Sequence, residues 1–469
     1  EDPNPNGPAV GLQVPWIVGS GFSFTPTELA YASNYVKAVV THNQAATHLW
    51  EISNEVSGKT NRPNSLSPED FAAYLVTNRT WIKAFDPQAS VVLPGCLGSL
   101  GLPVTNGPTW LRQVFTALTA LGTNGFDVVN YHDYKPWWAL PVQYDAYYAV
   151  MKEFNQTNLP VWVTESASAY TNAGSGPVVV YAGEDQQAAD VWRRSCLLFG
   201  KGVSLWIWHS FYSSSNSNFA FQGLLSPLPE AKKKKSWHAF HLLTQTIEGF
   251  QSAHLLQSGN ATTNLLTGGD GQWAVQFDWS DGTRRYVAWS NTNLNYTLTQ
   301  LDTNAAPYRI TRVVPATISA DGETVTFAIT TNNLTGTSLT LSGTNLPVLV
   351  ESTLSPYQIW ANTRIANATL RDTSSDPDGD GQNNYAEYLA GTNPMDNQSV
   401  FKLTQIQAES GHWRIYWNAV TNRTYSIQTS TALPAFTTSQ TNVVGTNTTM
   451  SWLDTNVYSA PTYYRLVIP

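Results

Sequence analysis

Short apolar segments alternate with amphipathic segments over the first half of this chain, and no other feature constrains its fold as strongly. Six segments have the composition of strands: 12–18, 48–53, 90–94, 126–132, 160–164 and 203–209. Continuous apolar strands separated by helices indicate a parallel sheet whose outer face is covered. The repeat length, about 35–45 residues, is typical of the βα units of a barrel. We therefore expect an α/β fold, a (β/α)8 TIM barrel of which about six βα units are visible.

Helix signals fall between these strands. The segment Thr25-Pro26-Thr27-Glu28 is a capping box with proline at the first helical position, and Ser67-Pro68-Glu69-Asp70 repeats the signal. One apolar face of a third helix is formed by Leu111, Val114, Phe115, Leu118 and Leu121. Gly122 is expected to end that helix.

The texture of the sequence changes after residue 250. The stretch "GQWAVQFDWSDGTRRYVAWSN" alternates apolar and polar residues around an Asp281-Gly282 turn, which is typical of an antiparallel hairpin. We therefore divide the chain into a TIM-barrel domain (1–250) and an antiparallel β-sandwich domain (251–360). A polar connector (361–397) and a smaller C-terminal β-sandwich module (398–469) follow.

Composition and charge narrow the possible partners. Charged residues make up only 12% of the 469 residues, the net charge is −8, and no basic face is evident, so a nucleic-acid partner is not expected. No apolar run approaches the ~18 residues of a membrane span. Cys96 and Cys196 are the only cysteines; two in so long a chain do not make a disulfide scaffold, and their pairing is left open.

Two glutamates stand at the ends of apolar strands. Glu55 follows "HLWEIS", and Glu165 comes 110 residues later in "PVWVTES", about three βα units further on. The carboxyl ends of barrel strands converge on one face, where the chemistry sits. Strands three places apart lie nearly across the barrel mouth. We therefore expect the two carboxylates to face each other over a few ångströms.

Such a pair suits the hydrolysis of a glycosidic bond with retention. One carboxylic acid protonates the leaving oxygen and the other carboxylate attacks the anomeric carbon, with the two groups roughly 5–5.5 Å apart. Asn54, beside Glu55, would offer an amide to a sugar hydroxyl. Glu51 lies on the same strand as Glu55 and is interpreted as a barrel-interior partner for a basic residue.

Four strand-end motifs occur in a fixed order: "WEISNE", "NYHDY", "VWVTES" and "LWIWHSFY". Together they resemble the clan A retaining glycoside hydrolases over roughly residues 11–247. The resemblance implies that Glu55 ends the fourth barrel strand as the acid/base, with Asn54 as its partner. It implies that Glu165 ends the seventh strand as the nucleophile.

The same resemblance implies further substrate contacts. His132 and Tyr134 would lie near Glu165, and Trp208 on the eighth strand would form a sugar platform, with Trp206 in the core. Trp137 and Trp138 follow the sixth strand; they could stack on sugar faces or anchor their loop by packing.

The chain departs from the family pattern at its start. If the strand before Glu55 is the fourth, residues 12–18 are the third, and strands one and two are missing. The opening "EDPNPNGP" has neither an initiator methionine nor a signal peptide. We infer either a trimmed start or a separate N-terminal fragment that completes the barrel.

The polar connector contains a calcium-loop motif. "DPDGDGQNNYAE" fits the pattern D-x-D-x-D-G-x5-E, and the predicted ligands are Asp376, Asp378, Asp380, the Gln382 carbonyl and Glu387. No long helix precedes the loop, so a paired EF-hand is not expected. With the following "YLAGTNP" it resembles dockerin-like or thrombospondin type 3-like repeats that join modules in secreted bacterial hydrolases. The expected ion is structural Ca²⁺, and no cofactor is expected for catalysis; the alternative is a solvated acidic linker.

Three functions are compatible with these features. The favoured one is a secreted (extracellular or periplasmic) retaining hydrolase that cleaves β-glycosidic bonds of a plant or algal polysaccharide or its oligosaccharides. The second is a non-catalytic carbohydrate-binding or surface-attachment protein on a degenerate barrel, motivated by the missing strands. The third is a transglycosylase that uses the same two glutamates.

Overall fold

The computed structural model describes most of the chain. The described residues are 26–55, 67–97, 106–170, 179–181, 183–213, 221–262, 268–291, 295–334, 336–342, 345–421, 423–446, 448–458 and 460–468. The expected strand at 12–18 lies outside these residues.

Parallel strands form the centre of the N-terminal half. They are β1 (Leu49–Glu51), β2 (Ser90–Val92), β3 (Cys96–Leu97), β4 (Val129–His132), β5 (Val161–Ser166) and β8 (Val203–Trp208). β1 pairs with β2, and β3, β4, β5 and β8 follow one another in a second sheet. A parallel bridge between Val92 and Val128 connects β2 to the chain just before β4. Parallel strands alternating with helices are thus confirmed, whereas closure into eight strands stays a prediction.

A helix follows nearly every one of these strands. The helices are α1 (Pro26–Asn43), α2 (Pro68–Phe85), α3 (Asn106–Ala120), α4 (Leu140–Glu153), α5 (Glu184–Lys201) and α6 (Lys235–Ile247). α2 begins as expected, because Ser67 Oγ accepts a hydrogen bond from the Asp70 N–H (3.0 Å). α5 ends at Gly202, whose φ of 103° is readily adopted only by glycine. Shorter elements are η2 (Trp137–Ala139), β6 (Ser168–Tyr170) and β7 (Val179–Tyr181).

The expected apolar face of α3 is correct except at its last residue. Leu111, Val114, Phe115 and Leu118 are buried, but Leu121 is 52% exposed. Leu121 follows the last helical residue, Ala120, so it no longer shares the direction of the buried face.

A six-stranded antiparallel sheet follows the barrel strands. Its order is β16 (Ile329–Asn332), β13 (Tyr308–Arg312), β18 (Val348–Ser352), β11 (Arg284–Ser290), β10 (Gln272–Asp278) and β9 (Ser252–Gln257). The Asp281-Gly282 turn connects β10 to β11 as expected, and Gly282 has a φ of 85°. Small additional elements are β12 (Tyr296–Leu298) paired with β17 (Leu339–Leu341), β14 (Thr317–Ile318) paired with β15 (Val325–Thr326), and η3 (Thr303–Ala305).

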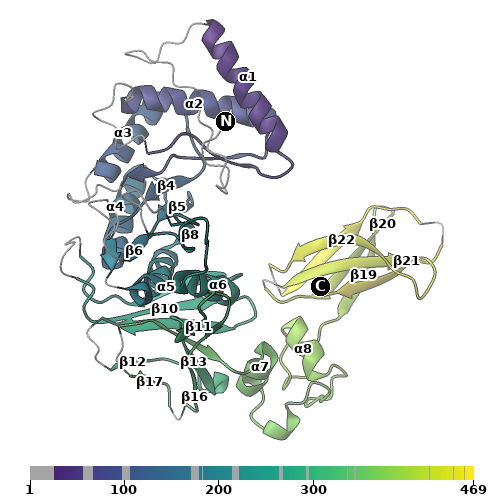
Figure 1. The fold of residues 1–469 in the computed structure, drawn as a ribbon. Helices are drawn as coiled ribbons and strands as arrows, with labels where there is room; N and C mark the ends of the chain where they lie inside the picture. The colour runs from purple at the N-terminus through teal and green to yellow at the C-terminus, as the bar shows by residue number, and fades with distance from the viewer. Residues whose placement is uncertain are drawn as a thin grey trace.

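The two faces of this sheet bury different partners. On one face the parallel rings of Trp273 and Trp289 (centroids 6.1 Å apart) belong to the same hydrophobic core as the barrel helices. On the other face Tyr286 packs with Leu298 and Leu339 of the small β12–β17 sheet. Figure 1 shows α5 and α6 between the parallel strands and this sheet. The α/β unit and the antiparallel sheet therefore share one core.

The last strand of the second domain ends earlier than the expected boundary at residue 360. β18 ends at Ser352, and helix α7 (Pro356–Arg364) begins before residue 360 because Ser355 and Gln358 form a complete capping box. The connector then contains η4 (Ala368–Leu370) and α8 (Asn384–Ala390).

The C-terminal module consists of two three-stranded sheets. One is β19 (Leu403–Glu409), β20 (His412–Asn418) and β23 (Thr449–Asp454); the other is β22 (Thr437–Val444), β21 (Thr424–Ser430) and β24 (Tyr463–Val467). Ile415, Trp417, Tyr425 and Ile427 form the buried centre of this module. In Figure 1 it lies beyond the segment that carries α7 and α8.

Two sequence expectations concern the chain as a whole. Among the described helices, none combines the length and apolarity required to cross a bilayer. Cys96 and Cys196 are both buried free thiols, so the open question of their pairing is resolved against a disulfide.

We predict that Leu118→Ala destabilises the protein and Leu121→Ala does not. Leu118 is only 3% exposed, and its truncation leaves a cavity that costs about 2–5 kcal/mol. Leu121→Ala, one helical turn away, should cost less than about 1 kcal/mol. Urea unfolding of the two variants measures both values, and equal losses would contradict this assignment of the buried face.

Candidate active site

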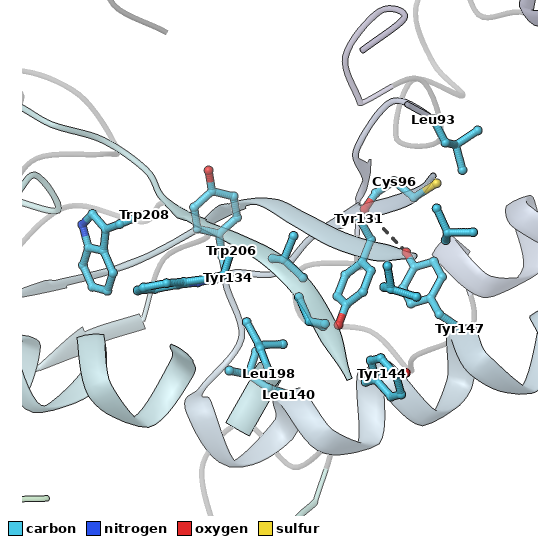
Figure 2. Close-up of a cluster of buried hydrophobic side chains, with 14 of the residues drawn as sticks. Leu93, Cys96, Tyr131, Tyr134, Leu140, Tyr144, Tyr147, Leu198, Trp206 and Trp208 are labelled. Carbon is cyan, nitrogen blue, oxygen red and sulfur yellow. Dashed lines mark hydrogen bonds between the residues drawn. The ribbon is translucent and has the colours of Figure 1, made fainter. Parts of the chain in front are cut away.

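The alternation of β4 separates a polar interior from an apolar exterior. Asn130 and His132 have the same parity and share hydrogen-bond partners on β5. Tyr131 has the opposite parity, and its ring stacks on Tyr147 of α4 (centroids 4.4 Å apart), as Figure 2 shows. The strand is thus held by core packing on one side and presents Asn130 and His132 on the other.

A β-bulge in β5 brings two consecutive side chains into the site. Asn130 is opposite Trp162 and His132 is opposite Glu165, so β5 has one more residue than β4 between these pairs. Thr164 and Glu165 would face opposite ways in a regular strand. Here the Thr164 hydroxyl lies 3.2 Å from His132 Nε2, while Glu165 Oε2 lies 3.4 Å from His132 Nδ1.

The two predicted carboxylates meet at His132. His132 Nδ1 is 2.8 Å from Glu55 Oε1, and the three groups each offer one atom within 4.8 Å of the others. Tyr134 donates a 2.5 Å hydrogen bond from its hydroxyl to Glu165 Oε2. The structure thus brings together Glu55, His132, Tyr134 and Glu165 from the ends of β1, β4 and β5.

The turn after β1 has an unusual backbone. Ser53 and Glu55 have φ values of 70° and 50°, a region that residues other than glycine seldom adopt. Asn54 lies between them and is half-buried. Residues held in such conformations cluster at functional sites, where surrounding contacts stabilise them.

The charges around His132 set its protonation. Burial, the largest influence, lowers the pKa of His132, but the hydrogen bond to Glu55 and the charge of Glu165 outweigh it and raise that pKa above its usual value. Burial, followed by the charge of Glu165, holds the pKa of Tyr134 well above its usual range. At neutral pH Tyr134 therefore keeps its proton and donates it in a hydrogen bond to Glu165.

A third carboxylate, Glu51, lies beneath this cluster. Its Oε1 accepts hydrogen bonds from the Gly95 N–H (2.9 Å) and from Asn130 Nδ2 (3.0 Å). The sequence interpretation paired Glu51 with a basic side chain. The donors that contact it are an amide, a backbone N–H and the Thr164 hydroxyl, while the basic residue His132 acts on it through its charge. Burial raises the pKa of Glu51 to about 7, and the charge of Glu165 adds to that rise.

The ends of β4 and β5 are held from behind by Arg194 of α5. This fully buried guanidinium donates to the Asp133 carbonyl (3.1 Å) and to Ser166 Oγ (3.0 Å), and it pairs with Asp190 at 2.5 Å. Because one planar group bonds both strand ends, it fixes the spacing between them.

The predicted aromatic platforms are more buried than expected. Trp208 is 6% exposed and donates its indole N–H to the Gln222 carbonyl (2.9 Å); Figure 2 shows it beside Trp206, whose ring centroid is 6.1 Å away. Trp137 is 1% exposed and contacts Trp273 and Trp289 edge to face.

The proposed sugar-stacking role of Trp137 is therefore corrected to core packing, because the β10–β11 hairpin covers its ring. Trp138 is half-buried against Trp137 (5.4 Å between centroids). This contact fits the alternative, left open by the sequence, that packing anchors the loop.

Several residues of the site were not singled out from the sequence. Gly95, Asn130 and Thr164 all contact Glu51 or His132. Asn130 had a usable signal, since it shares the parity of His132 on an otherwise apolar strand. Thr164 had none, because only the bulge turns it toward the site. A Cβ on Gly95 would overlap the His132 ring, which explains why this position is glycine.

The connector holds a separate acidic cluster. Asp376, Asp378 and Asp380 each offer a carboxylate oxygen within 4.8 Å of the others. Both oxygens of Asp376 accept backbone N–H groups of the loop, from Gly379 and Gly381. Asp378 and Asp380 each accept one through Oδ1; for Asp380 the donor is Gln382 at 2.7 Å. The Gln382 side chain donates from Nε2 to the Phe401 carbonyl (2.7 Å), and its backbone carbonyl is the candidate ligand that the motif predicts.

Glu387 of α8 supplies the feature that an acidic surface loop lacks. It is fully buried, and its Oε2 has no hydrogen-bond partner among the residues that the structure describes, as is also true of Asp378 Oδ2 and Asp380 Oδ2. Burial raises the pKa of Glu387 to about 7, and the charges of Asp378, Asp380 and Asp376 add to the rise. Carboxylate oxygens without a protein donor suit a hard divalent cation such as Ca²⁺. The 4.8 Å cluster itself consists of Asp376, Asp378 and Asp380, and Glu387 is coupled to it through charge. The Glu55–His132–Glu165 atoms, by contrast, are already hydrogen-bonded to one another or to Tyr134.

Comparison with known proteins assigns the N-terminal half to a class. Residues 15–226 match the profile of a family described as glycosyl hydrolase catalytic core. The matched segment contains both glutamates, His132, Tyr134 and Trp208. No curated protein sequence gives a significant match. Over residues 15–226 the chain is therefore similar to the catalytic core of glycoside hydrolases.

Solved structures of similar fold include three glycoside hydrolases. A family 39 enzyme from Bacteroides cellulosilyticus WH2 is 18% identical with a TM-score of 0.46, covering 74% of this chain and 65% of that one. A glucosidase from Croceicoccus marinus is 16% identical (TM-score 0.48; 70% and 75% covered), and a GH51 arabinofuranosidase from Xanthomonas axonopodis pv. citri is 12% identical (TM-score 0.48; 72% and 75% covered). At TM-scores below 0.5 these similarities bear on neither substrate nor linkage.

We predict that Gly95→Ala lowers glycosidase activity by about 100-fold, because the added methyl group displaces the His132 ring and, with it, Glu55. Gly336→Ala is the matched control, since nothing lies within 4 Å of a Cβ at that position. Activity and circular dichroism of both variants are the measurements. A folded Gly95→Ala enzyme with normal turnover would contradict the positioning of His132.

Proposed function

We propose that this protein is a retaining glycoside hydrolase that cleaves β-glycosidic bonds by double displacement with Glu55 and Glu165. The observation that supports the proposal is the spacing of the two carboxylates, which approach within 4.8 Å. Retaining enzymes place these groups about 5–5.5 Å apart, whereas inverting enzymes separate them by about 6.5–9.5 Å to admit a water molecule.

In the first step the Glu165 carboxylate attacks the anomeric carbon of the sugar. The bond from that carbon to the leaving oxygen breaks, and the Glu55 carboxylic acid transfers its proton to this oxygen. The Tyr134 hydroxyl holds Glu165 in place through the 2.5 Å hydrogen bond. The product of this step is a sugar covalently attached to Glu165.

In the second step Glu55, now a carboxylate, accepts a proton from water, and the oxygen of that water attacks the anomeric carbon. The bond to Glu165 breaks and the enzyme returns to its starting state. Because His132 Nδ1 lies 2.8 Å from Glu55 Oε1, it orients the Glu55 side chain in both steps.

The expected setting of the enzyme is part of the same proposal. We infer that the substrate is a plant or algal polysaccharide or its oligosaccharides and that the protein is secreted, to the extracellular space or the periplasm. A separate N-terminal fragment completing the barrel remains a further proposal. A carbohydrate-binding protein without turnover and a transglycosylase are the alternative outcomes of the tests below.

We further propose that the connector binds one structural Ca²⁺. The ligands would be carboxylate oxygens of Asp376, Asp378, Asp380 and Glu387 together with the Gln382 carbonyl. The ion would pair the buried carboxylate oxygens that lack hydrogen-bond partners and so stiffen the joint before the C-terminal module.

We predict that Glu165→Ala and Glu55→Gln each lower turnover of an aryl β-glycoside by about 10⁴-fold or more, since one loses the nucleophile and the other the proton donor. Glu153→Ala is the control, because this exposed glutamate of α4 pairs only with Arg112 among the described residues. Proton NMR of the wild-type reaction should show a product of the same anomeric configuration as the substrate.

Two outcomes would refute this assignment. Unchanged turnover in both glutamate variants would exclude them as catalytic groups. Inverted product configuration would exclude the covalent intermediate. Tight glycan binding without any turnover by the wild-type protein would instead favour the carbohydrate-binding alternative.

We predict that Ca²⁺ binds about tenfold or more weakly at pH 5.5 than at pH 8, because Glu387, with its pKa raised to about 7, must lose its proton to bind the ion. The same raised pKa means that the metal-free connector loses stability as pH rises through 7. Isothermal titration calorimetry measures the affinity.

Glu387→Gln should weaken Ca²⁺ binding at pH 8, while Asp372→Asn serves as the matched control because this exposed carboxylate of the connector caps Ser374 instead. Equal affinities for the two variants, or equal wild-type affinities at both pH values, would rule out Glu387 as a ligand.

A further inference from the structure

We infer that Glu51 is a positioning residue that holds the His132 ring, through Asn130 and Thr164, as an imidazolium between Glu55 and Glu165. This inference rests on the proposed function, since it assigns a role beneath the same two glutamates. Glu51 has no part in the double displacement itself. A hydrogen-bond network connects it to His132, and through this residue it acts on the reacting groups.

The Glu51 side chain is held by hydrogen bonds and not by packing alone. It is 9% exposed, and one of its oxygens accepts both the Gly95 N–H and Asn130 Nδ2. The two donors come from different segments, the loop after β2 and strand β4. A buried carboxylate is costly unless it is hydrogen-bonded, so a polar network at this depth calls for an explanation.

The network continues from Glu51 to the histidine. Asn130 Nδ2 also donates to Thr164 Oγ1 (2.8 Å), and Asn130 Oδ1 accepts from the Thr164 N–H (3.2 Å). Thr164 Oγ1 in turn lies 3.2 Å from His132 Nε2. Each link is a direct hydrogen bond between buried groups. Together the links connect Glu51 on β1 to the Nε2 edge of the His132 ring, opposite the Nδ1 edge that contacts Glu55.

The partners of the two ring nitrogens favour a ring that is protonated on both. His132 Nδ1 faces the Glu55 and Glu165 carboxylates, which are acceptors, so Nδ1 carries a proton. The Thr164 hydroxyl donates to Asn130 Oδ1 (3.1 Å), and it then accepts a proton from His132 Nε2. A ring that donates from both nitrogens is an imidazolium.

The surrounding charges also favour the protonated form of His132. The titratable groups that face Glu51 are His132 of β4, Glu165 of β5 and the Cys96 thiol of β3, and His132 faces Glu55 in addition. The negative charge of Glu51 raises the pKa of His132. Because the pKa of Glu51 itself is about 7, its ionisation adds that charge in the range where an imidazole would otherwise lose its proton.

The test is an NMR titration of the His132 ring in the wild-type protein and in Glu51→Gln. Glutamine keeps an oxygen that accepts from Gly95 and Asn130 but cannot ionise. We expect the titration midpoint of His132 to fall by at least ~0.5 pH unit. The alkaline limb of kcat/KM on an aryl β-glycoside should move to lower pH, while activity at pH 5 stays within about threefold of wild type.

A titration curve of His132 that superimposes on the wild type in the folded variant would overturn the inference. If Glu51→Gln does not fold, Thr164→Val decides in its place: it breaks the link to His132 Nε2 and should lower the midpoint, and Thr164→Ser should restore it. Glu153→Gln is the control for a remote glutamate and should leave the midpoint unchanged.

The two proposals fail separately. A displaced His132 midpoint in a protein without glycosidase activity would retain the role of Glu51 and refute the proposed function. A wild-type glycosidase whose His132 titration and pH profile are both unaffected by Glu51→Gln would retain the function and refute the role of Glu51, leaving it as a structural residue.

Discussion

The arrangement of the site depends on one imidazole placed between two carboxylates. Glu55 and Glu165 approach within 4.8 Å, a separation at which two negative charges repel by about 3–4 kcal/mol at an effective dielectric constant of 20. His132 lies within 2.8 Å of one and 3.4 Å of the other and so offsets this repulsion when it is protonated. Without the ring in this position, the repulsion would push the two glutamates apart or cause them to share one proton.

The protein scaffold keeps the ring there by three local devices. A glycine at position 95 leaves room for it, a bulge in β5 turns both Thr164 and Glu165 toward it, and Arg194 bonds the ends of β4 and β5 from behind. Each device acts on the backbone or on groups outside the reacting pair. The geometry of the glutamates is therefore a property of the strand ends, which belong to the shared core of helices and sheets.

Sequence patterns predicted the parts of the site that depend on regular periodicity. The apolar strands, their order and the positions of Glu55 and Glu165 at strand ends follow from repeat length and strand composition. Thr164 could not be predicted, because a bulge breaks the alternation on which parity arguments depend. The burial of Trp137 could not be predicted either, since it is caused by Trp273 and Trp289, which are more than a hundred residues away in the chain. Long-range contacts of this kind leave no local signal.

The most direct test of the central claim is to trap the sugar on the enzyme. Incubation with an activated 2-deoxy-2-fluoro-β-glycoside, followed by proteolysis and mass spectrometry, identifies the residue that forms the covalent bond. The double-displacement account predicts one sugar per chain, attached to Glu165 and absent in Glu165→Ala. Attachment to another residue, or continued turnover with no covalent adduct, would contradict it.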